Sequence, residues 1–404
     1  MRVAYYSPLP PEASGIADYS ALLLPALRRR VDLDVAKRGG RARGDVALYH
    51  VGNDPTAHGW IVEQLRREPG VVFLHDFVLH HLVAGLTLGR KDGAGYAAAM
   101  EREGGIAARL LALGVIDGCI PPLWEVRPEE FPLCGEVLGL ASGLLVHSGY
   151  VEERVRERGY AGPVWRVPHP AWEAPDVEPE RIGGGLAFGA FGNINPSKRT
   201  GQLLEAFARF HEEQPDARLL LVGREAAVDV ALRIDAAGLE GAVTHVDYVD
   251  ERRLWSLMAG VDAVVSLRSP TMGETSGTAI RALSLGKPLL VSEVGWFSEL
   301  PDEVALKVAP DEHEIDGLAA AFATLADAET RERMGAAAAG LAHTEHDVER
   351  VADAYVAALE EAAGGGAVRD AVARSIATAA ADVGIAAESR ETDAIARALD
   401  EVGL

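Results

Sequence analysis

Cysteine and long apolar runs are both scarce in this sequence, and their scarcity excludes several classes of protein. The 404 residues include only two cysteines, Cys119 and Cys134, which lack the spacing of metal ligands and fit reduced side chains of a cytosolic protein. No uninterrupted apolar stretch reaches the roughly 18 residues that a membrane-spanning helix needs. The run after Arg2 is typical of a strand and not of a signal peptide. We therefore expect a cytoplasmic protein.

Positive charge is also in short supply. Lys and Arg total 39 against 61 Asp and Glu, a net charge of −22. Because nucleic acids are bound by clustered cations, we do not expect so acidic a chain to bind them. One basic cluster is present within residues 28–43, and it comprises Arg28, Arg29, Arg30, Lys37, Arg38, Arg41 and Arg43. It is either a solvated helix end or a patch for an anionic acceptor or a phospholipid surface, which would place the protein at the inner face of the membrane.

Two common nucleotide-binding motifs are missing. No strand-like segment is followed by G-x-G-x-x-G, and no G-x-x-x-x-G-K-[ST] occurs. The first is the fingerprint of dinucleotide-binding domains and the second cradles the phosphates of nucleoside triphosphates. No motif in the sequence therefore supports hydride transfer or P-loop chemistry.

Short apolar segments alternate with helix-like segments along most of the chain. This alternation predicts an α/β protein with two Rossmann-like, doubly wound domains, each with a parallel sheet. Because ligands bind beyond the carboxyl ends of such strands, we expect the two domains to face each other across a cleft that holds the site. The expected strands are residues 3–7, 32–36, 46–51, 71–75, 143–147 and 164–167, and then 186–191, 218–222, 243–249, 263–267, 288–291 and 304–308.

Composition predicts the domain boundaries. Residues 168–185 are dense in Pro, Gly and charge and have no periodicity, which is typical of a linker. We predict an N-terminal acceptor domain at 1–170, a linker at 171–185 and a C-terminal donor domain at 186–345. Residues 346–363 are predicted to form a helix that returns to the N-terminal domain. Residues 364–404 begin with three glycines and form either an Ala-rich helical tail or a partly frayed segment.

Two loops of the second domain carry the strongest functional signals. The segment Arg268–Thr278 joins an apolar strand to a helix and contains Glu274, glycines and hydroxyl side chains. A helix N-terminus after such a loop can bind an anion, and Glu274 is better suited to holding sugar hydroxyls. The other loop ends in Lys198 and Arg199 at a helix start, where the dipole disfavours cations. It is either a solvated pair or a site for a bound polyanion.

The first domain has two weaker signals. His75 and Asp76 follow a strand, and Gly15 lies in the loop after the first strand, where a backbone can approach a phosphate closely. A histidine at a strand end is a candidate to contact a sugar, although many such residues are structural hydrogen bonders. A metal site made of His75, Asp76, His80 and His81 is an alternative that lacks a regular ligand pattern.

These loops resemble those of GT-B fold glycosyltransferases of the retaining group called family 4, in the branch with the sequence G-E-T-S-G. The resemblance covers about residues 1–362. In the first domain it comprises the family's glycine loop and active-site histidine. In the second domain it comprises a glycine followed six residues later by a lysine, the first carboxylate of the family's E-x(7)-E motif, and a G-x-P segment. The matching residues are Gly15, His75, Gly192, Lys198, Glu274 and Gly286-Lys287-Pro288.

The resemblance implies transfer of a hexosyl group from a UDP or GDP sugar to a glycan or lipid-linked acceptor with retention of configuration, as in polysaccharide biosynthesis. It implies no metal or other cofactor besides this nucleotide co-substrate. The catalytic residues would be Glu274 on the sugar, Lys198 on the leaving diphosphate and His75 on the sugar or acceptor. The residues expected to line the donor site are Gly15, Gly192, Asn193, Lys198, Arg199, Arg268, Thr275, Ser276, Gly277 and Thr278.

The sequence departs from the family pattern at two positions. Asn193 occupies the position of the family's phosphate-binding arginine. Ala282 occupies the position of the second glutamate of E-x(7)-E, whose carboxylate holds the ribose in that family. Two other functions therefore stay open. The chain could be a partner subunit that binds a sugar nucleotide without transferring the sugar. It could also be a GT-B sugar-nucleotide epimerase, which would need further carboxylates.

Overall fold

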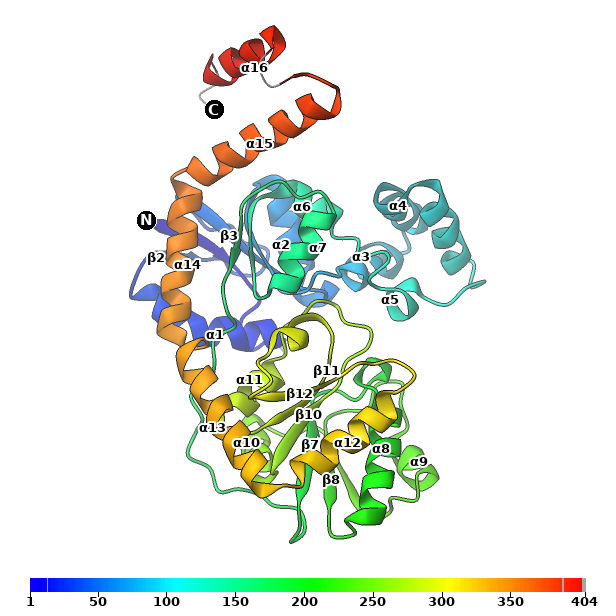
Figure 1. Cartoon of the computed structure of the whole chain (residues 1–404). Coiled ribbons are helices and arrows are strands. Elements are labelled where there is room, and N and C mark those ends of the chain that lie inside the picture. Colours follow the sequence, from blue (N-terminus) through cyan, green and yellow to red (C-terminus); the bar gives the residue numbers. More distant parts are fainter. Residues whose placement is uncertain (13, 387–388, 402–404) are drawn as a thin grey trace. The chain divides into compact units, whose positions relative to one another are not determined.

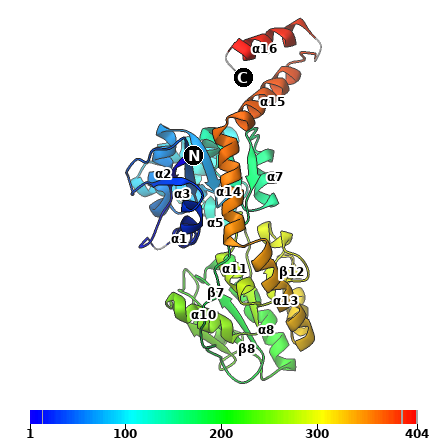
Figure 2. The same cartoon turned by 90° about the vertical axis from the view of Figure 1, so that its left-hand side faces the viewer.

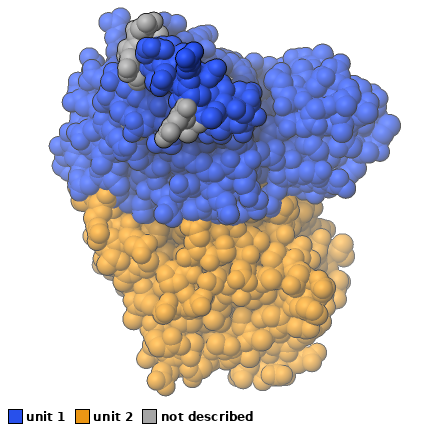
Figure 3. Space-filling view, turned by 45° about the horizontal axis from the view of Figure 1, so that its top comes forward, with its two compact units in different colours: residues 1–168, 351–404 blue, residues 169–350 orange. Residues whose placement is uncertain are grey.

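A computed structural model describes residues 1–12, 14–386 and 389–401 of this protein. The chain divides into two compact units, which are coloured separately in Figure 3. Unit 1 comprises residues 1–168 and 351–404, and unit 2 comprises residues 169–350. The chain therefore leaves unit 1 after its first 168 residues and returns to it at residue 351.

Unit 1 is built on a six-stranded parallel sheet in the order β2-β1-β3-β4-β5-β6 (Figure 1). Its central strands are mostly buried along their length, as expected where helices cover both faces of a parallel sheet. The strands are β1 (Arg2–Tyr6), β2 (Asp32–Val35), β3 (Val46–Val51), β4 (Gly70–Leu74), β5 (Ala141–Val146) and β6 (Val164–Arg166). The helices between them, other than those between β4 and β5, are α1 (Gly15–Arg28), α2 (Pro55–Arg67) and α7 (Gly149–Glu157).

Between β4 and β5 the chain forms a helical lobe, residues 75–140, whose helices α4 and α5 lie to one side of the sheet of unit 1 (Figure 1). Its main helix changes direction at Gly104 and Gly105, where Gly105 has a φ of 68° that only glycine adopts readily. Buried Tyr96, Met100 and Phe131 belong to a small core of its own. The elements are α3 (His80–Thr87), η1 (Leu88–Arg90), α4 (Gly93–Ile116), α5 (Leu123–Val126) and α6 (Gly135–Leu140).

Unit 2 contains a second six-stranded parallel sheet, in the order β12-β11-β10-β7-β8-β9. The strands are β7 (Ala187–Phe191), β8 (Arg218–Val222), β9 (Val243–Val246), β10 (Ala263–Ser266), β11 (Leu289–Ser292) and β12 (Ala305–Val308). The helices are η2 (Pro196–Lys198), α8 (Thr200–Glu213), α9 (Val230–Ala236), α10 (Glu251–Gly260), α11 (Gly277–Ser284), η3 (Gly295–Glu299), α12 (Glu314–Leu325) and α13 (Ala328–Thr344). The two sheets confirm the predicted α/β class with two Rossmann-like domains.

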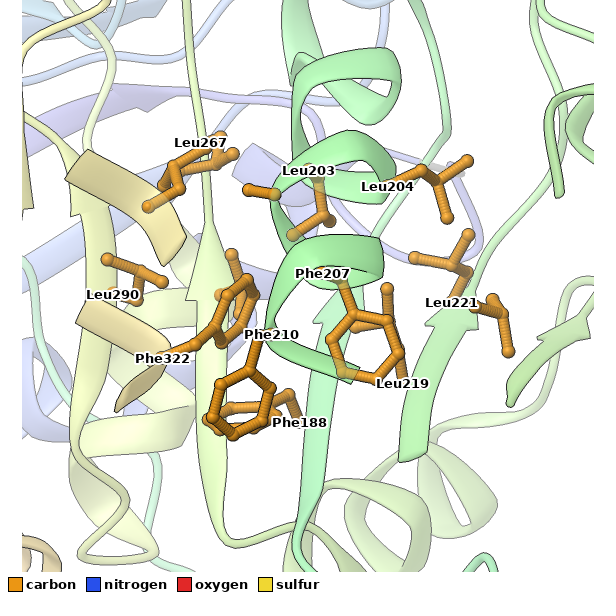
Figure 4. Close-up of a cluster of buried hydrophobic side chains, with 14 of the residues drawn as sticks. Phe188, Leu203, Leu204, Phe207, Phe210, Leu219, Leu221, Leu267, Leu290 and Phe322 are labelled. Atoms are coloured by element: carbon orange, nitrogen blue, oxygen red, sulfur yellow. The ribbon is translucent and has the colours of Figure 1, made fainter. Parts of the chain in front are cut away.

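Phenylalanine rings dominate one of the cores of unit 2. Phe207 and Phe210 project from α8 onto Phe188 of β7, as Figure 4 shows. Phe322 of α12 packs edge-on against Phe188 with 4.6 Å between the ring centroids. All four rings are buried, so α8 and α12 are held on the same face of the sheet by apolar packing.

The two chain segments that cross between the units are hydrogen-bonded to each other. Ala171 donates its N–H to the carbonyl of His346, and His346 Nδ1 lies 2.7 Å from the carbonyl of His169. The next helix, α14 (Val348–Ala363), contributes Tyr355 to the interior of unit 1, where its hydroxyl lies 2.6 Å from that of Tyr19. This buried pair fastens α14 to α1.

The chain ends in α15 (Gly366–Asp382) and α16 (Arg390–Glu401), which follow α14 in Figure 2. Residues 387–388 and 402–404 of the predicted Ala-rich tail lie outside the described residues. Among the helices that the structure describes, none combines the length and the apolar character needed to cross a bilayer.

Buried histidines crowd the carboxyl ends of β3 and β4. His50 Nδ1 lies 2.9 Å from His75 Nε2, and His58 Nδ1 lies 3.1 Å from the carbonyl of His50. Burial lowers the pKa of His50, and it lowers the pKa of His58 to about 4. Unit 1 therefore holds these imidazoles neutral at pH values where the unfolded chain would protonate them.

We expect unit 1 to lose stability in mild acid. Above pH 6.5, the ordinary value, the contribution of each buried histidine is fully present, and it is lost as the pH falls toward about 4. The free energy of unfolding should fall by about 2 kcal/mol for His58 between pH 6.5 and about 5. Urea unfolding of His58→Gln should show a shallower pH dependence, whereas His343→Gln, at an exposed site, should not. Equal slopes in both variants would contradict the prediction.

Candidate functional site

The candidate site lies where the strand order of unit 2 reverses. β7 and β10 are neighbours in the sheet, but the chain runs from β7 outward through β8 and β9 before it returns to β10. Loops that leave the carboxyl ends of two such strands diverge and leave room for a ligand. Here the loops after β7 and β10 approach each other, since Ser269 donates its N–H to the carbonyl of Ser197. Both loops predicted to carry function therefore meet at this switch point.

The N-terminus of α11 opens at this point. Ser276 caps the helix by accepting the N–H of Ala279, as capping hydroxyls commonly do. The N–H groups of Gly277 and Thr278 have no acceptor within the described residues. These donors and the helix dipole make this end of the sheet attractive to an anion.

Lys198, Gly192 and Thr278 converge in front of these donors. Gly192 has a φ of 101°, and a Cβ at this residue would lie 4.0 Å from Lys198 Nζ and 3.8 Å from Thr278 Oγ1. The glycine therefore keeps open the space that the two polar atoms share. Burial lowers the pKa of Lys198 to about 7, and the charge of Arg268 acts in the same direction. An ammonium group in this environment gains by the approach of an anion.

Glu274 is held inside its own loop. One carboxylate oxygen lies 2.7 Å from Arg268 Nε, and the other accepts the N–H of Met272 and the hydroxyl of Thr271. These contacts orient the carboxylate and balance its charge. Since each carboxylate oxygen can accept more than one hydrogen bond, the partly exposed Glu274 can still receive sugar hydroxyls.

Arg199 lies in the same loop, but its guanidinium is directed to a buried carboxylate. Its Nε lies 3.1 Å from Glu314 Oε2, and its Nη2 also contacts that oxygen. Glu314 is 2% exposed at the start of α12. The bond therefore joins the loop to α12, and Arg199 has a structural role that the sequence pattern does not indicate.

The other predicted donor-site residues have different environments. Asn193 is exposed beside Gly192, and Ser276 is used as the cap of α11. Thr275 Oγ1 is buried and has no hydrogen-bond partner within the described part of the chain. A buried hydroxyl without a partner is unfavourable, which makes Thr275 a candidate to meet a ligand or a water molecule.

The second departure from the family pattern is explained by packing. Ala282 is completely buried in the core beneath α11, so a carboxylate at this position would be desolvated. The preceding residue, Arg281, points elsewhere: its guanidinium lies 3.7 Å from the ring centroid of Trp172. A Cβ on Gly277 would lie 3.4 Å from Arg281 Nη1. Sequence reasoning missed this pair, although a tryptophan in a Pro- and Gly-rich linker is a signal for it.

His75 and Gly15 belong to unit 1, whereas the other predicted site residues belong to unit 2. His75 is 7% exposed at the end of β4 and is packed against Tyr19 and His147. Gly15 begins α1, and no heavy atom lies within 4 Å of the position of a Cβ there. Both follow strands at the carboxyl edge of the same sheet.

The alternative of a metal site near His75 finds no support in the geometry. His80 Nε2 bonds instead to the hydroxyl of Tyr96 inside the helical lobe. Across residues 1–12, 14–386 and 389–401, no group of three or more His, Cys, Asp or Glu side chains is arranged to hold a metal ion.

Comparison with protein families identifies the domain that carries this site. The family model for glycosyl transferases group 1 matches residues 180–340. This segment lies in unit 2 and includes Lys198, Glu274 and all of α11. No curated protein matches the sequence of the chain.

Solved structures extend the comparison over both units. Sucrose-phosphate synthase from Thermosynechococcus elongatus has a TM-score of 0.59 and 18% identity, covering 89% of this chain and 98% of its own. Anabaena HepE in complex with UDP and glucose has a TM-score of 0.55 and 16% identity, covering 89% of this chain and 100% of its own. Residues 180–340 thus match the model of glycosyl transferases group 1, in a chain that has the fold of GT-B glycosyltransferases.

Proposed function

We propose that this protein transfers a hexosyl group, with retention of configuration, from a nucleotide diphosphate sugar to a glycan or lipid-linked acceptor. The observation that carries the proposal is the convergence of Lys198 Nζ, Gly192 and the free N–H groups of α11 at the switch point of a glycosyl transferases group 1 domain. This arrangement suits a diphosphate. The UDP in the HepE structure makes a UDP sugar the first donor to test, with GDP sugars as the second.

In the proposed reaction, the bond between the sugar C1 and the diphosphate oxygen breaks and the acceptor oxygen binds C1 from the same face. The acceptor proton passes to the departing phosphate oxygen, so no side-chain nucleophile is required. Negative charge grows on the diphosphate, where Lys198 and the N–H groups of Gly277 and Thr278 stabilise it. We expect no metal ion or other cofactor to be needed.

Glu274 would receive hydroxyl groups of the donor sugar. Its contacts with Arg268 and Met272 orient the carboxylate before the donor binds, which is the preorganisation that transition-state stabilisation needs. We propose that His75 contacts the sugar or the acceptor and that the Gly15 backbone approaches the phosphate; both roles rest on resemblance to the family.

Arg281 is our candidate to hold the nucleoside in place of the missing carboxylate at residue 282. It stacks on Trp172, pairs with Glu251 and borders Gly277, so a guanidinium and an indole ring lie beside the first turn of α11. Guanidinium groups donate to ribose hydroxyls, and an indole offers a stacking surface. The partner-subunit alternative is favoured only by the departures at Asn193 and Ala282.

The basic cluster of residues 28–43 is partly used within unit 1. Arg30 pairs with Asp353, and Arg38 pairs with Glu12. Arg28, Lys37 and Arg41 are exposed. We propose that these cations meet an anionic acceptor or anionic lipid at the membrane surface.

Turnover of purified protein tests the proposed function. Incubation with UDP and GDP hexoses should release nucleoside diphosphate, measured by ion-exchange chromatography. Glu274→Ala should lower release by about 10²-fold or more, because an oriented contact to the reacting sugar is lost. Glu213→Ala, at an exposed residue of the same unit, is the matched control. Tight nucleotide binding without any release would favour the partner-subunit alternative, and near-normal release by Glu274→Ala would remove Glu274 from the site.

A further inference from the structure

The second half of α4 exposes a continuous apolar stripe. Ile106, Leu110, Leu113 and Ile116 are 65%, 62%, 42% and 39% exposed. Their spacing of four, three and three residues places them on one face of the helix. This stripe belongs to the helical lobe and lies outside the glycosyl transferases group 1 domain of unit 2.

The opposite face of the same segment is apolar as well. Ala108 and Ala112 are buried in the core of the lobe. Arg109 is the only charged residue from 106 to 116, and its guanidinium pairs with Glu101. A helix that is apolar on all sides is normally buried, and an exposed apolar patch marks a surface that contacts another apolar phase.

The helical lobe also borders a cavity with a mainly apolar lining. Its volume is about 600 Å³, within the range of sites for small ligands. Most of the apolar side chains that line it come from α2, α3, α6 and the segment before α3, and these include Val62, Leu79, Leu82, Val83, Leu86 and Val137. The first half of α4 contributes Ala99 and Arg102, so the cavity and the stripe share this helix.

Most of the charges in the cavity wall are already paired. Arg66 donates two hydrogen bonds to Glu136, and Glu103 pairs with Arg158. Arg102 is exposed and forms no ion pair among the described residues, although its charge helps to lower the pKa of Glu136. A cavity with an apolar lining, paired walls and one available cation fits a hydrocarbon chain that carries an anionic head group.

We propose that the helical lobe binds a lipid acceptor at a bilayer: the stripe of α4 enters the lipid surface, and the cavity receives a hydrocarbon chain. This inference rests on the proposed function, whose acceptor class it narrows to lipid-linked molecules. α4 contains two arginines and two glutamates, so it is neutral in a chain of net charge −22 and can approach a bilayer without strong repulsion. Four partly exposed side chains are also too few to supply the roughly 800 Å² per partner of a stable dimer.

Vesicle co-sedimentation tests the stripe. The full chain should sediment with vesicles of phosphatidylcholine alone, because apolar burial needs no anionic lipid. The variant Ile106→Gln, Leu110→Gln, Leu113→Gln should lose roughly tenfold in the bound fraction. Leu232→Gln is the matched control, since Leu232 is 63% exposed on α9 of unit 2; it should bind as the wild type does.

Three outcomes would overturn this assignment of the stripe. The first is unchanged binding by the triple variant. The second is binding that requires phosphatidylglycerol and is lost in Arg28→Gln, Arg41→Gln, which would assign the contact to the basic cluster. The third is concentration-dependent self-association that the triple variant abolishes while no vesicle binding is seen, which would make a second copy the occupant.

Titration with the fluorescent fatty acid cis-parinaric acid tests the cavity. Ala99→Phe and Val83→Phe should each fill part of the space and weaken binding by about tenfold. Ala107→Phe places the same ring on an exposed position of α4 and should bind normally. If all variants bind cis-parinaric acid with equal affinity and have unchanged circular dichroism spectra, the cavity is not the binding site of the hydrocarbon chain. If the wild type binds vesicles and parinaric acid but releases no nucleotide from any donor, the proposed function fails and the lipid site stands.

Discussion

Lys198→Met is expected to lower donor turnover by roughly 10²–10³-fold without unfolding the protein. Lys198 Nζ has no hydrogen-bond or ion-pair partner among the described residues, and it borders the space next to Gly192 and Thr278. Its removal therefore breaks no structural bond but takes away a cation that borders the same space as Thr278 of α11. Nucleotide release by the variant should be compared with that of Lys307→Met. In the wild type, Lys307 lies in β12 of the same unit and its side chain pairs with Asp302.

The protonation of Lys198 supplies a second measurement on the same residue. With a pKa of about 7, the free protein carries a charged Lys198 below neutral pH and a largely neutral one above it. A bound diphosphate favours the charged form and raises this pKa, so binding must take up a proton in alkaline solution. The affinity for a UDP sugar should fall by up to about tenfold for each pH unit above 7.

Isothermal titration calorimetry in buffers of different ionisation enthalpy measures this proton uptake. The wild type should take up nearly one proton at about pH 8 and very little at about pH 6. Lys198→Arg keeps its charge throughout this range, so its affinity should depend little on pH. Proton uptake by Lys198→Arg equal to that of the wild type would assign the titration to another group and weaken the role of Lys198.

Local patterns predicted the sheets well because buried parallel strands read as short apolar runs. Helix starts were less well predicted. The apolar spacing within residues 226–237 predicts a helix that begins at residue 226, but α9 begins at Val230, because Asp229 caps it by accepting the N–H of Leu232. The spacing within residues 57–67 likewise predicts a helix from residue 57, but α2 begins at Pro55, since Asp54 is its cap and proline is tolerated in a first turn.

Side-chain partners far apart in sequence were beyond the reach of such patterns. Lys198 and the first turn of α11 were predicted to act together because both follow strands of one domain, and the structure brings them close. Nothing local to Arg199 indicates Glu314, which lies 115 residues further along the chain. The stacking of Arg281 on Trp172 likewise depends on the path of the linker. Such pairings are set by tertiary packing and not by periodicity.

Arg199→Ala should destabilise unit 2 by about 3–5 kcal/mol. Glu314 is 2% exposed, and the substitution would leave its carboxylate buried without a cation. The desolvation penalty of the charge then acts against the folded state, or the carboxyl must be protonated. Urea unfolding monitored by circular dichroism measures the loss.

An exposed ion pair with α12 provides the control. Arg209 of α8 also contacts Asp316 of α12, but these side chains are 49% and 73% exposed. Because water screens an exposed pair, Arg209→Ala should lower stability by less than about 1 kcal/mol. The difference between the two alanine variants therefore isolates the effect of burial on an ion pair that joins α12 to the residues around α8.

The double variant Arg199→Met, Glu314→Leu separates a structural role from a functional one. It removes both charges and keeps apolar volume, so it should recover most of the stability that Arg199→Ala loses. If Arg199 only supports the loop, the double variant should bind a UDP sugar nearly as tightly as the wild type. If Arg199 also contacts the diphosphate, stability should return while affinity stays low. If Arg199→Ala loses no more stability than Arg209→Ala does, the Arg199–Glu314 pair does not hold the fold. Arg199 would then be available to bind the donor.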